Sequence, residues 1–149
     1  MATFDAGAVE VGVALLSPQA FLPVKAHPTD AGFDLAIPAE CRLGPHEHSR
    51  IDFEIAIEIP PGWYGQIFGR SSIFRQGLSV HPGVIDADYR GSIQILIANQ
   101  LPTQHVFSRG DRLAQLLVLP VPAVTMIQVA PEMLSHTTRG SGGLGSTGR

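Results

Sequence analysis

Cysteine, lysine and long apolar runs are almost absent from this sequence of 149 residues. Cys41, the single cysteine, has no partner for an internal disulfide and cannot by itself build a cysteine-ligated zinc site. No stretch approaches the ~20 consecutive apolar residues that a membrane-spanning helix needs, and the N-terminal segment lacks the basic start of a secretory signal. These absences predict a soluble, cytoplasmic protein that makes no membrane contact.

Charge is also scarce, at 15% of residues, whereas hydrophobic residues make up 44%. This length and composition predict one compact domain rather than a disordered chain. The net charge of −3 and the pI of about 6.0 argue against general nucleic-acid binding through a basic face. Because Lys25 is the only lysine, arginine supplies the other positive charges, and its forked guanidinium suits phosphate and carboxylate groups.

Glycine (16) and proline (12) are abundant, which predicts many turns and few long helices. The segment RIDFEIAIEI at 50–59 alternates apolar and polar residues, so we expect a strand with one buried face. Weaker strand signals lie at 9–16, 65–68, 92–98 and 112–119. Short strands separated by turn residues predict an all-β barrel or sandwich, with one or two helical turns at 71–76.

Two loops are unusual in composition. In AGFDLAIP at 31–38, Asp34 interrupts an apolar strand, where it either caps a turn or serves a site. In GRSSIFRQG at 69–77, Arg70 stands beside Ser71 and Ser72 at the expected start of the short helix. A charged fork, two hydroxyls and free backbone N–H groups can bind phosphate, although either serine could instead cap the helix.

The segment PGVIDADYRG at 82–91 predicts a β-hairpin with Asp86, Asp88 and Tyr89 at its tip. In one interpretation the aspartates only form the turn and the tyrosine packs across the strands. In the other, one aspartate is a general base and the tyrosine is a platform for a flat or sugar-like ligand. The residues alone leave both interpretations open.

The end of the chain, RGSGGLGSTGR at 139–149, is mostly glycine, serine and threonine, which predicts a mobile tail. Glycines let backbone N–H groups close around an anion, but without a lysine before the hydroxyls this is not a Walker loop. His46, Glu47 and His48 have metal-ligating side chains, yet no further ligand is evident and a solvated loop is the simpler interpretation.

Taken together and in order, five segments resemble the motifs of the trimeric dUTP pyrophosphatases (dUTPases). They are AGFDL at 31–35, GRSS at 69–72, GVIDADYRG at 83–91, RLAQL at 112–116 and RGSGGLGSTG at 139–148. The resemblance implies a small β-barrel-like jelly roll that forms a homotrimer with active sites between subunits. It also implies a barrel domain at 1–138 and a C-terminal arm at 139–149 that closes over a site.

The resemblance further implies hydrolysis of dUTP to dUMP and pyrophosphate, with Asp86 as the carboxylate that activates water for attack on the α-phosphorus. Base and sugar would be bound by Gly83, Val84, Ile85, Tyr89 and Leu144. The phosphates would be bound by Arg70, Ser71, Ser72, Gln115, Arg139, Gly145, Ser146 and Thr147. Asp34 would support a hydrated Mg²⁺ indirectly, through water, while the triphosphate oxygens hold the metal.

Three departures from the family pattern bear on this prediction. Leu144 replaces the usual phenylalanine that stacks over the uracil, and Ser72 replaces a glycine. The connection 78–82 is shorter than in many members and lacks an asparagine on the uracil side. All three departures lie in segments that the resemblance assigns to binding of the substrate.

Two alternatives remain open at this point. The homologous dCTP deaminases also carry GRSS, but they need a glutamate on the strand after the third motif, where this chain has SIQILIANQ with Leu96 near that position. A non-catalytic, nucleotide-binding regulatory trimer could keep the same fold.

Overall fold

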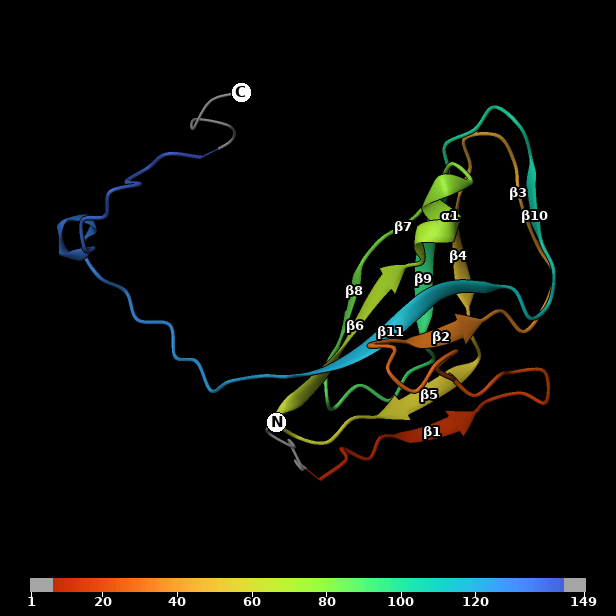
Figure 1. The fold of residues 1–149 in the computed structure, drawn as a ribbon, viewed down its shortest axis with the longest axis horizontal. Helices are drawn as coiled ribbons and strands as arrows, with labels where there is room; N and C mark the ends of the chain where they lie inside the picture. The colour runs from red at the N-terminus through yellow and green to blue at the C-terminus, as the bar shows by residue number, and fades with distance from the viewer. Residues whose placement is uncertain (1–6, 144–149) are drawn as a thin grey trace.

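The computed structural model describes residues 7–143, and almost all of the regular structure in them is β (Figure 1). The strands are β1 (Gly12–Leu15), β2 (Phe33–Ala36), β3 (Cys41–Leu43), β4 (His48–Asp52), β5 (Ile55–Glu58), β6 (Trp63–Gly69), β7 (Leu78–Val80), β8 (Gly83–Ile85), β9 (Gln94–Asn99), β10 (His105–Phe107) and β11 (Arg112–Pro120). One short helix, α1 (Ser71–Arg75), and a 3₁₀ turn at Pro131–Met133 complete the set in the described residues. The expected all-β, barrel-like class is confirmed.

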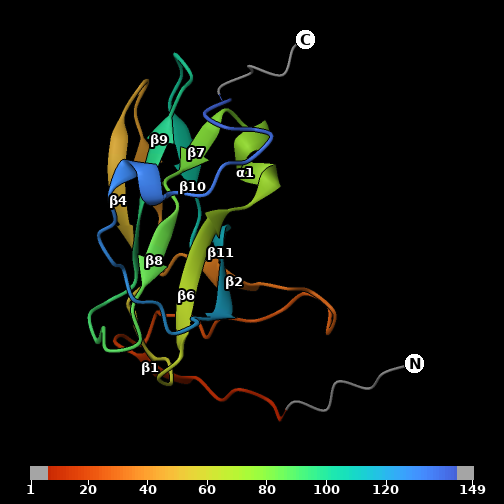
Figure 2. The same cartoon turned by 90° about the vertical axis from the view of Figure 1, so that its left-hand side faces the viewer.

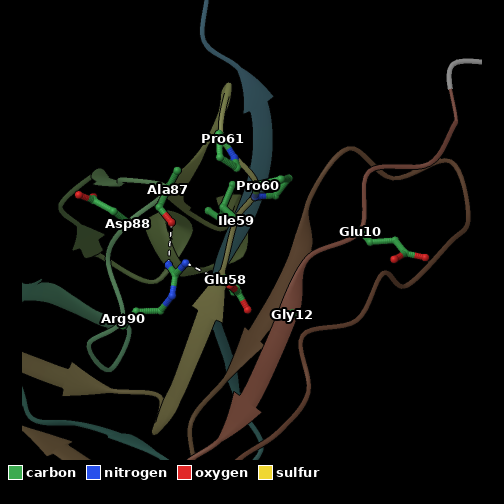
Figure 3. Close-up of a pocket in the computed structure, with 9 residues that line it drawn as sticks. All are labelled: Glu10, Gly12, Glu58, Ile59, Pro60, Pro61, Ala87, Asp88 and Arg90. Atoms are coloured by element: carbon green, nitrogen blue, oxygen red, sulfur yellow. Dashed lines mark hydrogen bonds and ion pairs between the residues drawn. The ribbon is translucent and has the colours of Figure 1, made fainter.

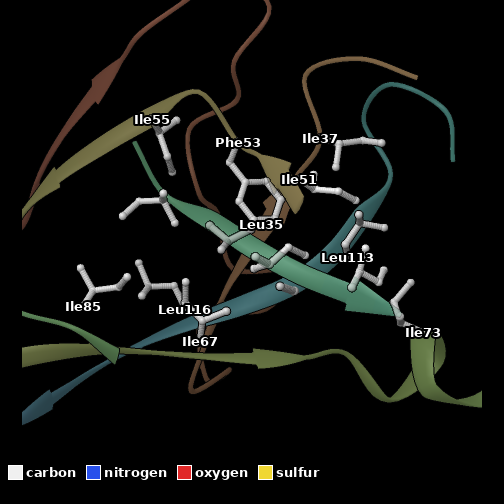
Figure 4. Close-up of a cluster of buried hydrophobic side chains, with 14 of the residues drawn as sticks. Leu35, Ile37, Ile51, Phe53, Ile55, Ile67, Ile73, Ile85, Leu113 and Leu116 are labelled. Carbon is white, nitrogen blue, oxygen red and sulfur yellow. The ribbon is translucent and has the colours of Figure 1, made fainter. Parts of the chain in front are cut away.

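Two antiparallel sheets form the body of the barrel. One has the order β2-β11-β6-β8 and the other β4-β9-β7, while β1 pairs with β5 and β3 with β10 in two-stranded ladders. Figure 2 shows the two larger sheets on opposite sides of the interior. The core between them is made of aliphatic side chains from both, and Figure 4 shows Ile67 and Leu116 from one sheet facing Ile51 from the other.

The apolar alternation expected at 50–59 is confirmed, but the single strand is not. Ile51, Phe53, Ile55 and the other apolar members of the run are buried, with exposed fractions of 6%, 1% and 1% for these three. The backbone breaks at Glu54, which has φ 55, so that β4 pairs with β9 while β5 pairs with β1. The chain changes sheets at this residue and still keeps every second side chain in the core.

Asp52 holds this break together. Its carboxylate accepts hydrogen bonds from the Glu54 N–H (2.7 Å), the Gln94 side chain (2.7 Å) and the Ser92 hydroxyl. Burial opposes ionisation, but these hydrogen bonds outweigh it and the pKa of Asp52 lies below its ordinary value. The carboxylate thereby ties the end of β4 to the chain entering β9.

We expect Asp52→Asn to destabilise the fold at neutral pH by no more than about 1 kcal/mol, because solvent screens this partly exposed group. A carboxyl whose pKa is lowered by folding stabilises the protein above its unfolded value of about 3.9, and this contribution is lost as the pH falls through the folded pKa. Urea unfolding of both proteins should therefore show a gap at pH 7 that shrinks below about pH 4. A gap independent of pH would contradict this role of Asp52.

The remaining expected elements are found with small changes in their bounds. Strands β1, β6, β9 and β11 lie in the segments that predicted them, and α1 occupies most of 71–76. The helix is stopped by Gly77, which directly follows the C-cap residue Gln76, has φ 75 and lies so close to Leu101 that a Cβ would be 2.6 Å from its Cδ2 atom. Only glycine combines this backbone conformation with this contact.

The hairpin expected at 82–91 is wrong. Strand β8 pairs with β6, whereas the next strand, β9, pairs with β4 and β7 in the other sheet. The segment 86–92 therefore crosses from one sheet to the other instead of joining two paired strands. The expected turn is present, closed by the hydrogen bond from the Tyr89 N–H to the Asp86 carbonyl, but strand pairing depends on distant residues that turn residues do not reveal.

After β11 the chain leaves the barrel, and residues 121–143 extend away from it (Figure 1). This segment is almost entirely exposed and includes large apolar side chains such as Met126 (92% exposed), Ile127 (76%) and Met133 (74%). The domain boundary predicted between 138 and 139 stays a prediction, while the departure from the barrel itself follows Pro120. Between residues 7 and 143, no helix has the length and apolar character needed to cross a membrane.

Candidate functional site

Asp34, Arg70 and Arg112 form an ion-pair cluster at one end of the larger sheet. Asp34 lies on β2, Arg112 begins β11, and Arg70 directly follows β6. Because β11 pairs with β2 on one side and β6 on the other, the carboxylate reaches both guanidiniums. Its Oδ1 is 3.1 Å from Arg70 Nε and its Oδ2 is 3.0 Å from Arg112 Nη1.

The charges in this cluster do not balance. The Asp34 side chain is only 13% exposed, whereas those of Arg70 and Arg112 are 29% and 47% exposed. Arg70 is fixed further because its Nη1 donates to the Arg112 carbonyl at 3.2 Å. One carboxylate thus orients two arginines and leaves a net positive charge facing solvent, an arrangement suited to a polyanion.

Gln115 lies next to this cluster, opposite Asp34 in the β2–β11 register and opposite Phe68 in the β11–β6 register. Gly32 approaches its side chain so closely that a Cβ at this position would be 2.8 Å from Gln115 Oε1. The glycine in the AGFDL segment therefore leaves room for the amide of Gln115. Expected phosphate-binding residues from two separate segments, together with Asp34, the expected support of the metal, thus lie around one end of the sheet.

Ser71 and Ser72 are the first residues of α1, and both are exposed. The capping alternative is wrong, because Arg70 is the N-cap residue and no side chain caps this end. Beside them lies a cleft of about 520 Å³ whose lining includes Arg70, Ser72 and Arg112, the carboxylate of Asp111, and apolar residues such as Val106. The two hydroxyls are free to contact a ligand that approaches the arginines.

A second candidate site is the turn that follows β8. The Tyr89 N–H donates to the Asp86 carbonyl at 3.1 Å, and the Tyr89 hydroxyl donates to the Ser92 carbonyl at 3.1 Å. A Cβ on Gly91 would overlap the Tyr89 hydroxyl, so glycine is required there. Asp86 is exposed and Tyr89 is 43% exposed, so the turn presents a carboxylate and an aromatic ring on the surface.

The strand before this turn offers mainly its backbone. Ile85 is 9% exposed and belongs to the core, whereas Val84 is 62% exposed. The Gly83 carbonyl accepts a hydrogen bond from Gln66 Nε2 at 3.0 Å, which fixes β8 against β6. Of the three expected base-binding residues, only Val84 therefore presents its side chain to solvent.

The two sites lie at opposite ends of β6 (Figure 2). Ile85 pairs with Gly65 near the start of β6, whereas Arg70 follows Gly69 at its end. Since a strand rises ~3.3 Å per residue, Asp86 and Arg70 of one chain are roughly 15–20 Å apart. No single phosphate group can contact both of them in the same chain.

The metal-ligating side chains that the structure describes do not gather into a protein cage. Within residues 7–143, no group of three or more His, Cys, Asp or Glu side chains could hold a metal ion. Both oxygens of Asp34 already pair with arginine, and Glu47 accepts a hydrogen bond from the Gly44 N–H at 2.5 Å in an exposed loop. This donor set fits a Mg²⁺ that arrives with phosphate oxygens and keeps most of its waters.

Sequence reasoning assigned most of these residues but missed Arg112 as a member of the cluster. The signal was present, because Arg112 begins the RLAQL segment that was singled out. Arg139 lies on the extended segment and donates from Nε to the Gly142 carbonyl at 2.8 Å. The expected arm residues Leu144, Gly145, Ser146 and Thr147 lie outside the described residues.

A barrel with paired arginines and exposed serines at one end, and an aspartate–tyrosine turn at the other, describes a small all-β nucleotide hydrolase. The family model described as dUTPase matches residues 19–148. The deoxyuridine 5'-triphosphate nucleotidohydrolase of Thermobifida fusca (strain YX) is 41% identical over 146 residues, covering 95% of this chain and 80% of the relative. The chain belongs to the dUTPase family.

Solved structures give the same result. A mutant dUTPase of Staphylococcus bacteriophage 80alpha, solved with dUpNHpp, superposes with a TM-score of 0.87 at 28% identity, covering 94% of this chain and 99% of that one. A mutant dUTPase of phage phi11 of S. aureus, whose structure reveals how a structural Mg(II) ion is coordinated, superposes with a TM-score of 0.76 at 28% identity. It covers 80% of this chain and 96% of that one. The match to dUTPases leaves the deaminase alternative without support.

Proposed function

We propose that this chain hydrolyses dUTP to dUMP and pyrophosphate with Mg²⁺, in sites that are assembled between the subunits of a homotrimer. The reaction is that of a dUTP diphosphatase, which removes dUTP from the precursors of DNA and supplies dUMP. The substrate is therefore a free nucleotide rather than a nucleic acid, and we place the enzyme in the cytoplasm with the other nucleotide pools.

The separation of the two candidate sites along β6 is the observation that carries this proposal. In-line attack on the α-phosphorus requires the activated water to be about 3–3.5 Å from the reacting atom, with the phosphate-binding groups around it. Asp86 and Arg70 of one chain are too far apart for this, so Asp86 of one subunit must face Arg70 and Gln115 of another. Repeating this head-to-tail contact closes a ring with one site at each interface.

The segment that leaves the barrel supports the same assembly. Met126, Ile127, Met133 and Leu134 expose large apolar side chains along 121–134, with Leu134 64% exposed. In a monomer this apolar surface would be exposed to water, whereas association with other subunits would bury it. The segment would then carry Arg139 and the following arm residues to a site formed by two other subunits.

Each residue then has a defined task in the reaction. The Asp86 carboxylate accepts the proton of the attacking water, and the Tyr89 ring packs on the deoxyribose and leaves no room for a 2′-hydroxyl. The backbone of 83–89 binds the uracil edge. Arg70, Ser71, Ser72 and Gln115 bind the phosphates and stabilise the charge that develops on the leaving pyrophosphate.

Asp34 keeps the two arginines in place and would support a hydrated metal ion by accepting a hydrogen bond from one of its waters. When bound, Mg²⁺ neutralises phosphate charge and polarises the bond that breaks. Arg139, Gly145, Ser146 and Thr147 would close over the β- and γ-phosphates, and Leu144 would cover the base. This closure would exclude bulk water from the site.

Pyrophosphate release from dUTP, measured with Mg²⁺ beside dCTP, dTTP and UTP, tests the proposal. We expect cleavage of dUTP to exceed that of each other nucleotide by at least about 100-fold, because the backbone of 83–89 binds the base edge and the Tyr89 ring closes off the 2′ position. Conversion of dCTP to a uracil nucleotide without pyrophosphate release would assign the deaminase activity instead. No turnover of any nucleotide would overturn the proposed function.

A further inference from the structure

Arg90 makes two side-chain hydrogen bonds to the turn that carries Asp86 and Tyr89. Its Nη1 donates to the Ala87 carbonyl at 2.6 Å and to the Tyr89 carbonyl at 3.0 Å. Its Nη2 lies 3.3 Å from Glu58 Oε1 on β5. Figure 3 shows the guanidinium between the turn and Glu58, with a hydrogen bond on either side.

Packing supports this turn poorly on its outer side. A cleft of about 750 Å³ separates the turn from the N-terminal strand and is lined by Pro60, Ala87, Asp88 and Arg90, among others. On the far side of the turn, the tyrosine ring is partly exposed. A turn that crosses between two sheets beside an open cleft needs polar contacts to hold one conformation.

Glu58 faces a glycine, Gly12, across the β1–β5 ladder, and a Cβ at this glycine would make only ordinary van der Waals contact with it, at 3.4 Å from Glu58 Cβ and 3.6 Å from its Oε2 atom. Glu58 is itself at the end of β5, which is anchored by buried neighbours on both sides in sequence, Ile57 and Ile59. The carboxylate therefore provides Arg90 with an attachment to the rigid barrel.

The ion pair adds little to global stability. Arg90 and Glu58 are 51% and 72% exposed, and exposed pairs of this kind contribute little to folding free energy. What the arginine can do is local, since its Nη1 atom donates to the carbonyls on both sides of Asp88. These carbonyls belong to the peptide units that precede Asp88 and follow Tyr89, so the contacts fix the backbone that carries the tyrosine ring.

We propose that Arg90 is a positioning residue for the turn 86–89 and that Glu58 anchors it, so that the pair sets the discrimination of this enzyme against a 2′-hydroxyl. This inference rests on the proposed function. Tyr89 excludes a ribose only if its ring lies at a fixed height above the sugar, and the Tyr89 carbonyl is one of the two groups that Arg90 holds. If the contacts of Arg90 are lost, the Tyr89 ring can move, and the site then accepts the 2′-hydroxyl of UTP.

Four variants test this proposal through the ratio of kcat/KM for dUTP to that for UTP. Arg90→Lys keeps the charge but loses the fork, and Glu58→Ala removes the anchor alone. We expect the ratio to fall about tenfold in Arg90→Lys and about threefold in Glu58→Ala, in line with the loss of charge-assisted hydrogen bonds. In the double variant the loss of Glu58 should add almost nothing, because Glu58 acts through Arg90.

Glu40→Ala is the matched control, because Glu40 forms a similar exposed pair with Arg42 at 2.7 Å on another part of the barrel. It should leave the ratio unchanged. A purely structural role of Arg90 would lower the melting temperature and slow both nucleotides equally, with an unchanged ratio, and would overturn the inference. Additive effects of the two substitutions would also overturn it.

The outcome separates this inference from the function on which it rests. A wild-type chain that does not hydrolyse dUTP overturns the proposed function and the inference with it. If the wild-type chain hydrolyses dUTP and the variants discriminate against UTP to the same degree as the wild type, only the inference about Arg90 is overturned.

Discussion

Replacing Asp86 with asparagine should lower kcat for dUTP hydrolysis by about 1,000-fold and change KM by no more than a few-fold. An amide cannot take the proton of the attacking water, and a positioned general base contributes typically 10²–10⁴-fold to a rate. The fold should not change, because Asp86 is exposed and contributes to the turn through its backbone carbonyl. Pyrophosphate release under single-turnover conditions measures the effect on the chemical step.

Asp88→Asn is the control for this experiment. Asp88 lies two residues away on the same turn but lines the outer cleft. It should therefore keep its rate to within a few-fold. Calorimetric binding of dUpNHpp should remain in both variants, since the analogue needs no proton transfer. An Asp86→Asn enzyme with more than a tenth of the normal rate would remove Asp86 from the catalytic role.

Deleting residues 139–149 should lower kcat/KM for dUTP by at least about 100-fold. The deletion removes the expected contacts of Arg139, Ser146 and Thr147 with the β- and γ-phosphates, and charge-assisted hydrogen bonds of this kind are the strong ones. It also leaves the site open to water during the reaction. Steady-state kinetics with dUTP on the intact and shortened chains measures the loss.

The shortened chain should keep its assembly, because the apolar segment 121–134 remains. Light scattering and thermal unfolding provide this control, and both should match the intact protein. A shortened chain with full activity would contradict the role of the arm as a lid. A shortened chain that dissociates would instead assign residues 139–149 to the subunit interface.

The strands could be predicted from the sequence because their burial is periodic. Alternation at 50–59 identified the buried residues correctly even though the backbone breaks at Glu54. The break itself has no local signal, since a glutamate with positive φ is unusual and is held there by hydrogen bonding to Asp52. Sequence periodicity therefore reported which side chains face the core, but not which sheet each half of the run joins.

The sequence identified most residues of the candidate site but did not show how they lie relative to one another. Arg70 was expected to bind phosphate and Asp34 to support the hydrated metal. The ion pair between them depends on the position of β11 between β2 and β6. Arg112 also joins this cluster, although it is 78 residues from Asp34 in the sequence, and no local pattern reveals such a contact. The distance between Asp86 and Arg70 depends in the same way on the pairing of β8 with β6.

Mixed trimers test most directly whether each site takes Asp86 from one subunit and Arg70 from another. Asp86→Asn and Arg70→Ala chains should each be almost inactive alone. When they are co-expressed in equal amounts and assemble at random, an intact Asp86 meets an intact Arg70 at one interface in four, so about a quarter of wild-type activity should return. If both residues served the same site within one chain, mixing the two variants would restore no activity. A mixed sample with only the average activity of the two variants would therefore contradict a site shared between subunits.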